Sequence, residues 1–335
     1  MSLSLKKSEI SLVVIVPCFN EEEMLDLFYS ELIRAIDCYS YRIIFINDGS
    51  TDKTLQKIKF LSAYNNRCQY LSFSRNFGHQ MALRAGYNYA KDADCVVSID
   101  ADLQQPPLLI GKMVEAWLDG YQVVNAIRTQ NRRLPLFKRG SSLLFYKMIN
   151  YFSSRKIVES SPDFRLLDKK VVNVLNAAKE RSLFLRELVS WVGFKQKSIE
   201  FEVAVRQYGK SKYSVRKMFS LAINGVFAYG INPLRLAIFI GVILSVMSFT
   251  YALYAVFNYL YTNNNIPGWT SMMASFLLIA GFQFILIGVI GEYLGKTYLE
   301  IKGRPNYIVD ESNISHLSPA FDFPVNEVNS YTSAI

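Results

Sequence analysis

The sequence predicts an α/β fold in which a mostly parallel sheet carries helices on both faces, followed by helices at or in a membrane. Short β-branched runs alternate with amphipathic segments over the first 127 residues. These runs are apolar almost throughout, which is typical of strands buried on both faces of a parallel sheet. No charged residue occurs between Arg235 and Glu292, so a strongly apolar part follows the α/β part.

The expected elements follow from this alternation. We expect strands over 12–16, 41–46, 69–73, 95–99 and 122–127, separated by helices over about 21–37, 52–64, 79–91 and 108–119. The pattern is less regular afterwards. There we expect a helix over 137–152, a loop over 153–162, a helix over 184–192 and a strand over 198–203.

The apolar part predicts membrane helices. Lys and Arg precede apolar residues over 213–229, which favours a helix in the membrane interface; an ordinary helix facing the core is the alternative. The ranges 234–258 and 270–293 each exceed the ~20 residues needed to span a bilayer. Positive residues flank this pair but are absent from the turn at 262–268. The positive-inside rule therefore places both ends in the cytoplasm.

The expected organisation has four parts: a cytoplasmic α/β domain (1–212), an interfacial helix (213–232), a transmembrane hairpin (233–295) and a cytoplasmic tail (296–335). After Asp310 the tail is polar, and we expect it to be disordered. Small residues in the second span favour a homo-oligomer contact through Gly281, Gly288, Gly291 and Gly295.

Composition excludes several classes of protein. The net charge is +9, but Lys and Arg crowd 195–217 and 296–304, beside the apolar stretch. Attraction to anionic lipid explains this placement, and no nucleic-acid-binding motif accompanies it. The four cysteines form no CxxC pair and there are only two histidines, which excludes structural zinc. We expect free, buried thiols and no signal peptide.

Polar residues follow each predicted strand, where ligands bind to parallel sheets. Asp100 and Asp102 come directly after one strand, and Gln104 follows them. Such oxygen ligands suit Mg²⁺ or Mn²⁺ bound together with substrate phosphates. The alternatives are a solvated acidic strand end and a phosphatase-like nucleophilic Asp. The residues usually found downstream of such a nucleophile are absent.

Two other strand ends are informative. In Pro17-Cys18-Phe19-Asn20-Glu21-Glu22, Pro17 fixes a turn, Phe19 offers an aromatic surface and Asn20 is suited to cap the next helix; capping alone is the alternative. In Asn47-Asp48-Gly49-Ser50, we expect Asp48 to bind a base or ribose, while Gly49 permits close backbone approach. No GxGxxG follows the first strand, so a nicotinamide cofactor is not expected.

Taken in order, these motifs resemble the polyprenyl-phosphate glycosyltransferases of glycosyltransferase family 2, such as dolichol-phosphate mannose synthases and bactoprenol glucosyltransferases. The likeness runs from about residue 10 to 309. It rests on the two motifs above and on Ser74-Arg75-Asn76-Phe77-Gly78, Asp100-Ala101-Asp102-Leu103-Gln104, Asp163-Phe164-Arg165 and Tyr208-Gly209-Lys210-Ser211-Lys212-Tyr213-Ser214. Processive relatives carry a QxxRW motif that is absent here, which favours transfer of a single sugar.

The resemblance implies a GT-A fold and assigns roles to residues. The nucleotide would be bound by Pro17, Phe19, Asn20, Glu21, Asp48, Asp100 and Ala101, and the metal by Asp100, Asp102 and Gln104. Arg128, Arg206 and Lys212 match positions expected to meet the diphosphate or the lipid phosphate; together with Asp100, Asp102 and Asp163 they form the expected catalytic set. Many members of that family carry a second Asp where this sequence has Asn47, so the resemblance assigns no role to this side chain.

The implied activity is inverting, metal-dependent transfer of one sugar, with glucose from UDP-glucose expected, to undecaprenyl phosphate. Such a product serves cell-envelope glycosylation, for example O-antigen modification of lipopolysaccharide. The expected location is the inner membrane, with several spans and both termini in the cytoplasm. A catalytically silent scaffold or flipping partner and a processive synthase are the alternatives. Asp163 is either a general base or a residue that orients Arg165 or the acceptor, and a purely structural salt bridge to Arg165 is the alternative. His79 is expected to be structural.

Overall fold

The computed structural model describes residues 7–128, 163–178, 185–201 and 268–314, together with single residues and short runs between 239 and 261. The chain divides into two compact units. The first combines 1–133, 158–210 and 304–335, and the second combines 134–157 and 211–303.

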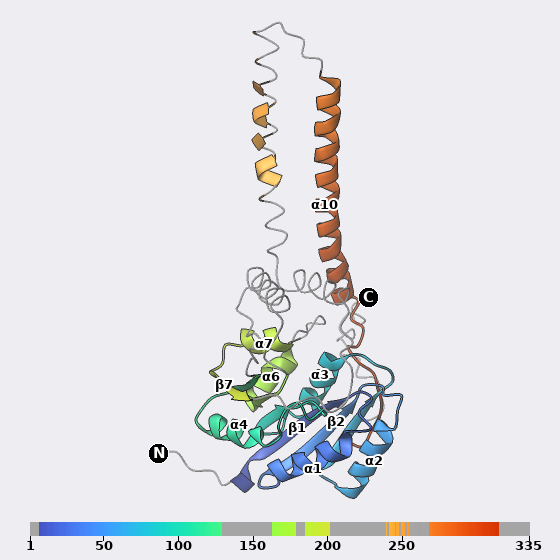
Figure 1. Cartoon of the computed structure of the whole chain (residues 1–335), viewed down its shortest axis with the longest axis vertical. Helices are drawn as coiled ribbons and strands as arrows, with labels where there is room; N and C mark the ends of the chain where they lie inside the picture. The colour runs from blue at the N-terminus through green and yellow to red at the C-terminus, as the bar shows by residue number, and fades with distance from the viewer. Residues whose placement is uncertain are drawn as a thin grey trace, which may run out of the picture. The chain divides into compact units, whose positions relative to one another are not determined.

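The first unit is built on one sheet of eight described strands, in the order β7-β5-β6-β4-β1-β2-β3-β8 (Figure 1). The strands are β1 (Ser11–Cys18), β2 (Ser40–Asn47), β3 (Cys68–Phe73), β4 (Cys95–Ser98), β5 (Val123–Arg128), β6 (Arg165–Asp168), β7 (Gln196–Phe201) and β8 (Val309–Ser312). Strands β4, β1, β2 and β3 are mutually parallel, whereas β6 and β8 run antiparallel to their neighbours. The predicted mostly parallel sheet is confirmed.

Pro17 lies inside the central strand β1, a position that normally disfavours proline because it lacks the amide hydrogen needed for the ladder. The pairing of β1 with β4 ends at Ile15 and Ser98, while the pairing with β2 continues to Cys18 and Asn47. Backbone groups alternate in direction along a strand, so Pro17 faces the β4 side just beyond the last pair. Its missing amide hydrogen therefore falls where the ladder between β1 and β4 ends.

Helices cover both faces of the sheet. On one face, α1 (Leu25–Ile36), α2 (Thr54–Tyr64) and α4 (Leu109–Leu118) pack on alternate strand residues such as Leu12 and Val14. On the other, α3 (His79–Tyr89), α6 (Lys169–Ala177) and α7 (Leu185–Trp191) pack on the intervening residues, including Val13 and Ile15. The near-continuous apolar strands thus have a physical cause, because each face is buried against helices.

The structure corrects the sequence analysis at several places. Strand β6 and helix α6 were not predicted. The expectation of disorder after Asp310 is wrong for the described residues, because β8 runs through Ser312 and hydrogen bonds continue to Ile314. The cysteines are free as expected, but Cys38 is exposed rather than buried.

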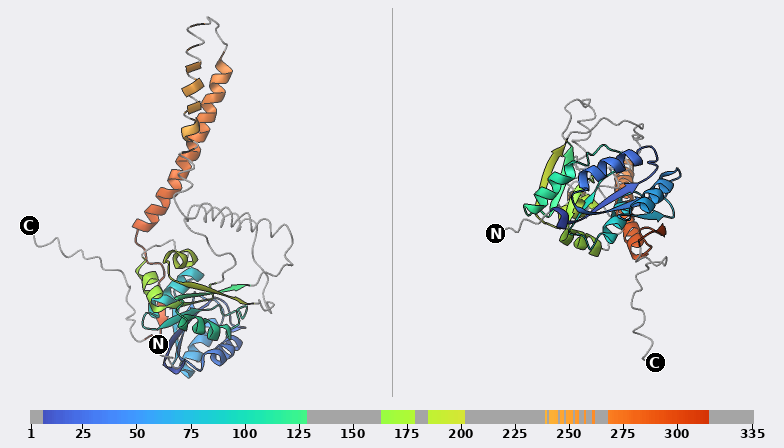
Figure 2. Two further views of the ribbon diagram at one scale, coloured as in Figure 1. Left: turned by 90° about the vertical axis from the view of Figure 1, so that its left-hand side faces the viewer. Right: turned by 90° about the horizontal axis from the view of Figure 1, so that it is seen from below.

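In the second unit, α10 (Trp269–Ile301) is one continuous helix that extends the predicted 270–293 at its C-terminal end (Figure 2). Its segment Ile279–Ile301 has a mean hydropathy of 1.3. By length and composition it is the one described helix able to cross a membrane. Two transmembrane helices are therefore not confirmed. The first expected span falls largely outside the described residues, as do the ranges 137–162 and 213–232.

We predict that Gly86→Ala lowers stability because helix α3 packs closely on β1 at this residue. A Cβ atom at Gly86 would clash with Cγ2 of Ile15. Overpacking of this kind costs about 1–3 kcal/mol, so the melting temperature of the purified protein should fall by several degrees. Gly111→Ala in α4 is the control, since its Cβ would meet only the Tyr39 hydroxyl oxygen at 4.0 Å. An equal loss in both variants would contradict the prediction.

Candidate active site

The predicted site residues converge because of strand direction. The pairing makes β1 to β5 point the same way, so their carboxyl ends share one edge of the sheet. Strand β6 is antiparallel to β4, with Arg165 opposite Ser98. Its beginning, and therefore Asp163, lies at the same edge. Six chain segments thus meet where the sequence placed a site.

The loops after β1 and β2 bind each other through side chains. Asn20 Oδ1 accepts a hydrogen bond from Thr51 N at 2.9 Å, and Ser50 Oγ accepts one from Asn20 N at 3.1 Å. Glu22 and Asp52 likewise accept from backbone amides of the opposite loop. Asn20 does not cap α1, which begins at Leu25 after Met24 without a side-chain cap. The capping prediction is wrong, and Asn20 instead joins two loops of the site.

Asp48 is buried and its carboxylate organises the loop before α3. It accepts hydrogen bonds from Phe77 N at 2.7 Å and Gly78 N at 3.0 Å. Burial raises its pKa above the ordinary value, although these two amides and His79 act in the opposite direction. The adjacent Gly49 has φ +66°, and a Cβ there would clash with the backbone of Arg75 and Asn76. Direct contact of Asp48 with a nucleotide stays a prediction.

The acidic pair lies on a tight turn after β4. Asp100 Oδ2 accepts a hydrogen bond from Gln105 Nε2 at 2.6 Å, and Gln105 Oε1 in turn accepts one from Asp100 N. Asp102 Oδ1 accepts a hydrogen bond from Gln104 N at 3.1 Å. Leu103 between them has φ +55°, a conformation that a leucine rarely adopts. The turn therefore holds both carboxylates and Gln104 on one short segment.

These residues fit a divalent metal of the Mg²⁺ type. Such ions need only one or two carboxylates, because waters and substrate phosphates complete the coordination. Desolvation raises the pKa of Asp100, and the charges of Asp102 and Asp163 raise it further, although His79 opposes them. A nearby cation would lower the free-energy cost of keeping the Asp100 carboxylate ionised. Among the described residues, no group of three or more His, Cys, Asp or Glu side chains is placed to hold a metal ion. The described residues therefore form no metal site made of such protein ligands alone.

Asp163 is the most heavily hydrogen-bonded carboxylate at this edge. It is buried and accepts from Arg165 Nη2 at 3.0 Å and from Arg186 through two nitrogens, at 3.0 and 3.2 Å. Gln80 Nε2 donates to it at 3.1 Å. Burial alone would raise the pKa of Asp163, but the bond to His79 and the two arginines outweigh it and hold this pKa far below its usual range.

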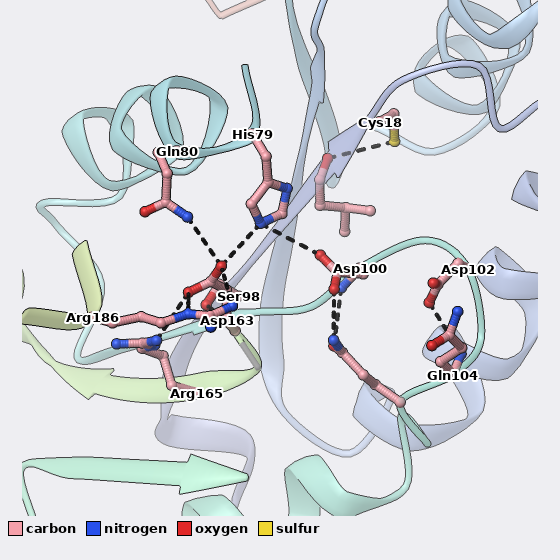
Figure 3. A network of polar contacts seen from close by, with 12 residues as sticks. Cys18, His79, Gln80, Ser98, Asp100, Asp102, Gln104, Asp163, Arg165 and Arg186 are labelled. Carbon is pink, nitrogen blue, oxygen red and sulfur yellow. Dashed lines mark hydrogen bonds and ion pairs between the residues drawn. The ribbon is translucent and has the colours of Figure 1, made fainter. Parts of the chain in front are cut away.

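His79 lies between the two acidic groups, as Figure 3 shows. Its Nε2 is 3.3 Å from Asp163 Oδ2 and 3.7 Å from Asp100 Oδ1. Burial lowers the pKa of His79, but the hydrogen bond to Asp163 and the charges of both carboxylates outweigh this and raise it. The first residue of α3 therefore joins the acidic turn to the Asp163 cluster.

Arg128 closes the other side of the acidic turn. Its Nη2 donates to Gln104 Oε1 at 3.4 Å, a long hydrogen bond. Its Nε is buried and has no hydrogen-bond partner among the described residues. A guanidinium that is desolvated and only partly paired is suited to receive an anion, since buried polar groups normally find partners.

Comparison with known proteins agrees with the geometry. Residues 13–175 match the model of Glycosyl transferase family 2, and residues 232–297 match the GtrB C-terminal hairpin. An uncharacterized glycosyltransferase, YkcC of Bacillus subtilis, is 39% identical over 301 residues, covering 89% of this chain and 93% of the relative. The SfII prophage-derived bactoprenol glucosyl transferase of Shigella flexneri is 38% identical, covering 90% and 97%.

The chain belongs to glycosyltransferase family 2. Among solved structures, glucosyl-3-phosphoglycerate synthase from Mycobacterium tuberculosis matches with a TM-score of 0.42 at 16% identity, over 65% of this chain and 78% of that one. The sequence-based recognition of the family is confirmed.

The structure of this glycosyltransferase gathers most residues predicted for its site. Pro17, Phe19, Asn20, Glu21, Asp48, Asp100, Ala101, Asp102, Gln104, Arg128 and Asp163 all lie on segments at one edge of the sheet. Arg206 and Lys212 lie outside the described residues. The sequence analysis did not find Gln80, Gln105 and Arg186, and it placed His79 outside the site. The Asp163–Arg165 pair that it offered as an alternative is present.

We predict that Asp163→Asn destabilises the glycosyltransferase. Removing the charge leaves Arg165, which is 3% exposed, without its buried partner. Breaking such a pair costs about 3–5 kcal/mol, so the melting temperature should fall by on the order of 10 °C. Asp119→Asn is the control, because its side chain is largely exposed and 3.7 Å from Lys197. Its melting temperature should match the wild type.

The stability that the Asp163 carboxylate contributes should depend on pH. Since the pKa of Asp163 is held far below its usual range, its contribution to stability is present above pH ~4, the ordinary Asp value, and is lost as pH falls below it. The gap in melting temperature between wild type and Asp163→Asn should therefore be large near pH ~5.5 and shrink towards pH ~3. A gap that stays constant would contradict the prediction.

Proposed function

We propose that this glycosyltransferase transfers a single glucose from UDP-glucose to a polyprenyl phosphate, with inversion at the anomeric carbon. The observation that carries the proposal is the acidic turn Asp100–Gln104 beside Arg128, at the edge where the strands end. The names of the bactoprenol glucosyl transferases, 38% identical over most of the chain, support the sugar and the acceptor.

The residues of the turn have separate roles in this proposal. Asp100, Asp102 and Gln104 would hold Mg²⁺ or Mn²⁺, which supplies Lewis-acid stabilisation of the leaving diphosphate when bound. Gln105 keeps the Asp100 carboxylate oriented through its 2.6 Å hydrogen bond. Arg128 would receive diphosphate charge on its Nε, which has no hydrogen-bond partner among the residues that the structure describes. Pro17, Phe19, Glu21, Asp48 and Ala101 form the expected nucleotide site, and Asn20 holds its loops together.

We propose that Asp163 positions other groups and is not a general base. A phosphate monoester has its second pKa near ~6, so the acceptor is largely ionised at neutral pH and no proton need be removed. Asp163 already accepts hydrogen bonds from two arginines, Gln80 and His79. A carboxylate with so depressed a pKa is a weak base. Its proposed task is to hold Arg186 and His79 at the sheet edge.

Membrane attachment follows from the same proposal. The acceptor is a lipid, and α10 contains the apolar segment Ile279–Ile301, with exposed side chains such as Phe284 and Ile285. We propose the inner membrane as location, with a second span before residue 262, both termini cytoplasmic and the product used for cell-envelope glycosylation. Arg206 and Lys212 are proposed to meet the lipid phosphate or the diphosphate. A homo-oligomer through the α10 glycines stays a prediction.

One experiment separates this activity from the alternatives. The purified protein is incubated with radiolabelled UDP-glucose, undecaprenyl phosphate and Mg²⁺ or Mn²⁺, and the lipid phase is analysed. We expect a lipid-linked monosaccharide. A polymer would indicate a processive synthase, and no product with any nucleotide sugar of a panel would indicate a scaffold. Chelation with EDTA should abolish the product, and added Mn²⁺ should restore it.

We predict that Asp102→Asn lowers the turnover number roughly 100-fold or more, because one carboxylate of the metal site loses its charge. The asparagine can still accept the hydrogen bond from Gln104 N, so the melting temperature should change little. Transfer assays at saturating Mn²⁺ measure the effect. Asp119→Asn, which removes a carboxylate on the surface, should keep full activity. Wild-type activity in Asp102→Asn would contradict the assignment of Asp102 as a metal ligand.

We also predict that the activity lost in Asp163→Asn is not recovered by raising the pH. If Asp163 removed a proton from the acceptor, a higher pH would ionise the acceptor and restore the rate. If it positions Arg186 and His79, the ratio of mutant to wild-type kcat should stay flat between pH ~5 and ~8, on both sides of the acceptor pKa near ~6. A ratio that climbs as the pH rises to about 6 and then levels off would show that Asp163 is the base.

A further inference from the structure

The segment after α10 returns to the first unit and completes the sheet. We call residues 304–314 the C-terminal strap. Its strand β8 pairs antiparallel with β3, placing Val309 opposite Phe73 and Ser312 opposite Leu71. Asn313 Oδ1 accepts a hydrogen bond from Tyr70 N at 2.7 Å, and Ser74 N donates to the carbonyl oxygen of Ile308 at 3.1 Å. The strap therefore covers the edge of β3 that would otherwise be unpaired.

Tyr307 of the strap contacts the aromatic cluster beside the donor loop, residues 74–78. Its ring stacks on Phe73, with centroids 5.0 Å apart and planes 19° apart. Phe73 in turn meets Phe77 edge to face at 5.8 Å. Asn88 Nδ2 on α3 donates a hydrogen bond to the Tyr307 hydroxyl at 3.0 Å. One strap side chain is thus fixed against both β3 and α3.

The donor loop is where these contacts reach the site. Phe77 donates its backbone amide hydrogen to Asp48, and the next residue, Gly78, does the same before α3 begins with His79. Arg75 stacks on the Phe77 ring at 4.4 Å. The backbone of residues 75 and 76 also lies against Gly49. A shift of Phe77 would therefore move groups that hold both Asp48 and His79.

We propose that Tyr307 is a positioning residue of this glycosyltransferase: by stacking on Phe73, it holds the donor loop in the conformation that presents Asp48 and His79. The strap is then a part of the donor site, although it lies beyond both family-matched segments, which end at 175 and 297. The link to donor binding rests on the proposed function, whereas the effect on the loop does not.

The test compares Tyr307→Ala with Tyr307→Phe in the full-length protein. Phenylalanine keeps the stack on Phe73 and loses the hydrogen bond from Asn88 to the hydroxyl, whereas alanine removes both. Glu311→Gln is the strap control, since it weakens the ion pair to Lys59 at 2.7 Å without touching the stack. Two measurements are made: hydrogen exchange of the backbone amides of 74–79 without ligand, and binding of UDP with Mn²⁺.

For exchange, we expect the 74–79 amides to exchange faster in Tyr307→Ala, while those of β1 and β2 keep wild-type protection. Tyr307→Phe and Glu311→Gln should match the wild type at 74–79. Faster exchange across the whole sheet would mean a general loss of stability and would overturn the positioning role. Unchanged exchange at 74–79 would overturn it as well.

For binding, Tyr307→Ala should weaken UDP binding roughly five- to tenfold, the range expected for loss of one aromatic pair. The KM for UDP-glucose should rise by a similar factor, and the KM for undecaprenyl phosphate should stay the same. Equal effects on both KM values, or none on UDP binding, would overturn the link to the donor. If the wild type does not bind UDP, the proposed donor is wrong, and the exchange data alone decide whether Tyr307 positions the loop.

Discussion

The buried carboxylate of Asp163 is the interaction on which the site depends. Taking a charge out of water is costly unless it is paired and hydrogen-bonded, and here the pairing is extensive. The donors come from β6, α7 and α3: Arg165, Arg186, Gln80 and His79. The Asp163 carbonyl also accepts from Ser98 on β4. Residues from four elements are therefore fixed at one point, and the pairing of the two arginines depends on the negative charge of Asp163.

The loops that face this cluster are held by a different means. Between the β1 and β2 loops, backbone amides donate to side-chain oxygens of the opposite loop, which leaves few loop groups unpaired. Asn47 adds a buried link, because its amide nitrogen donates to Ser72 Oγ at 2.9 Å while its oxygen accepts from Ser50 N. An Asp at this position has no amide nitrogen to donate. The Asn47 side chain therefore has a structural role here.

The first five strands could be predicted because they are apolar almost throughout, and the first four helices because amphipathic segments alternate with these strands. The sequence did not predict β6 and β8, which are four residues long and carry charged residues such as Arg165, Asp168, Asp310 and Glu311. Their place in the sheet depends on pairing with β4, β5 and β3 rather than on their own composition. Helix α6 was not predicted either, although Asp168 caps it by accepting a hydrogen bond from Lys170 N.

The site could be predicted only as far as it is local. The DxD turn and the motifs after β1 and β2 are each a continuous stretch of sequence, so their residue types and spacing were sufficient to predict them as parts of the site. The neighbouring partner of Asp163, Arg165, was predicted as an alternative, but the distant partners were not, because Arg186 lies 23 residues away and Gln80 lies 83 residues away in sequence. His79 was judged structural for the same reason: nothing local reveals that two carboxylates lie within 4 Å of its ring.

The electrostatic arrangement fits a reaction between two anions. The pKa of Asp163 is held far below its usual range by His79 and the two arginines, so Asp163 keeps its negative charge at neutral pH, and the same carboxylate together with Asp100 raises the pKa of His79. Arg128 and Arg186 carry permanent charges. Asp100 differs, because desolvation raises its pKa, and among the described residues its carboxylate is stabilised by Gln105 and the more distant His79. It is thus the carboxylate at this edge with most to gain from a divalent cation. Under the proposed function, that need couples metal binding to donor binding, since the diphosphate brings further oxygen ligands to the same ion.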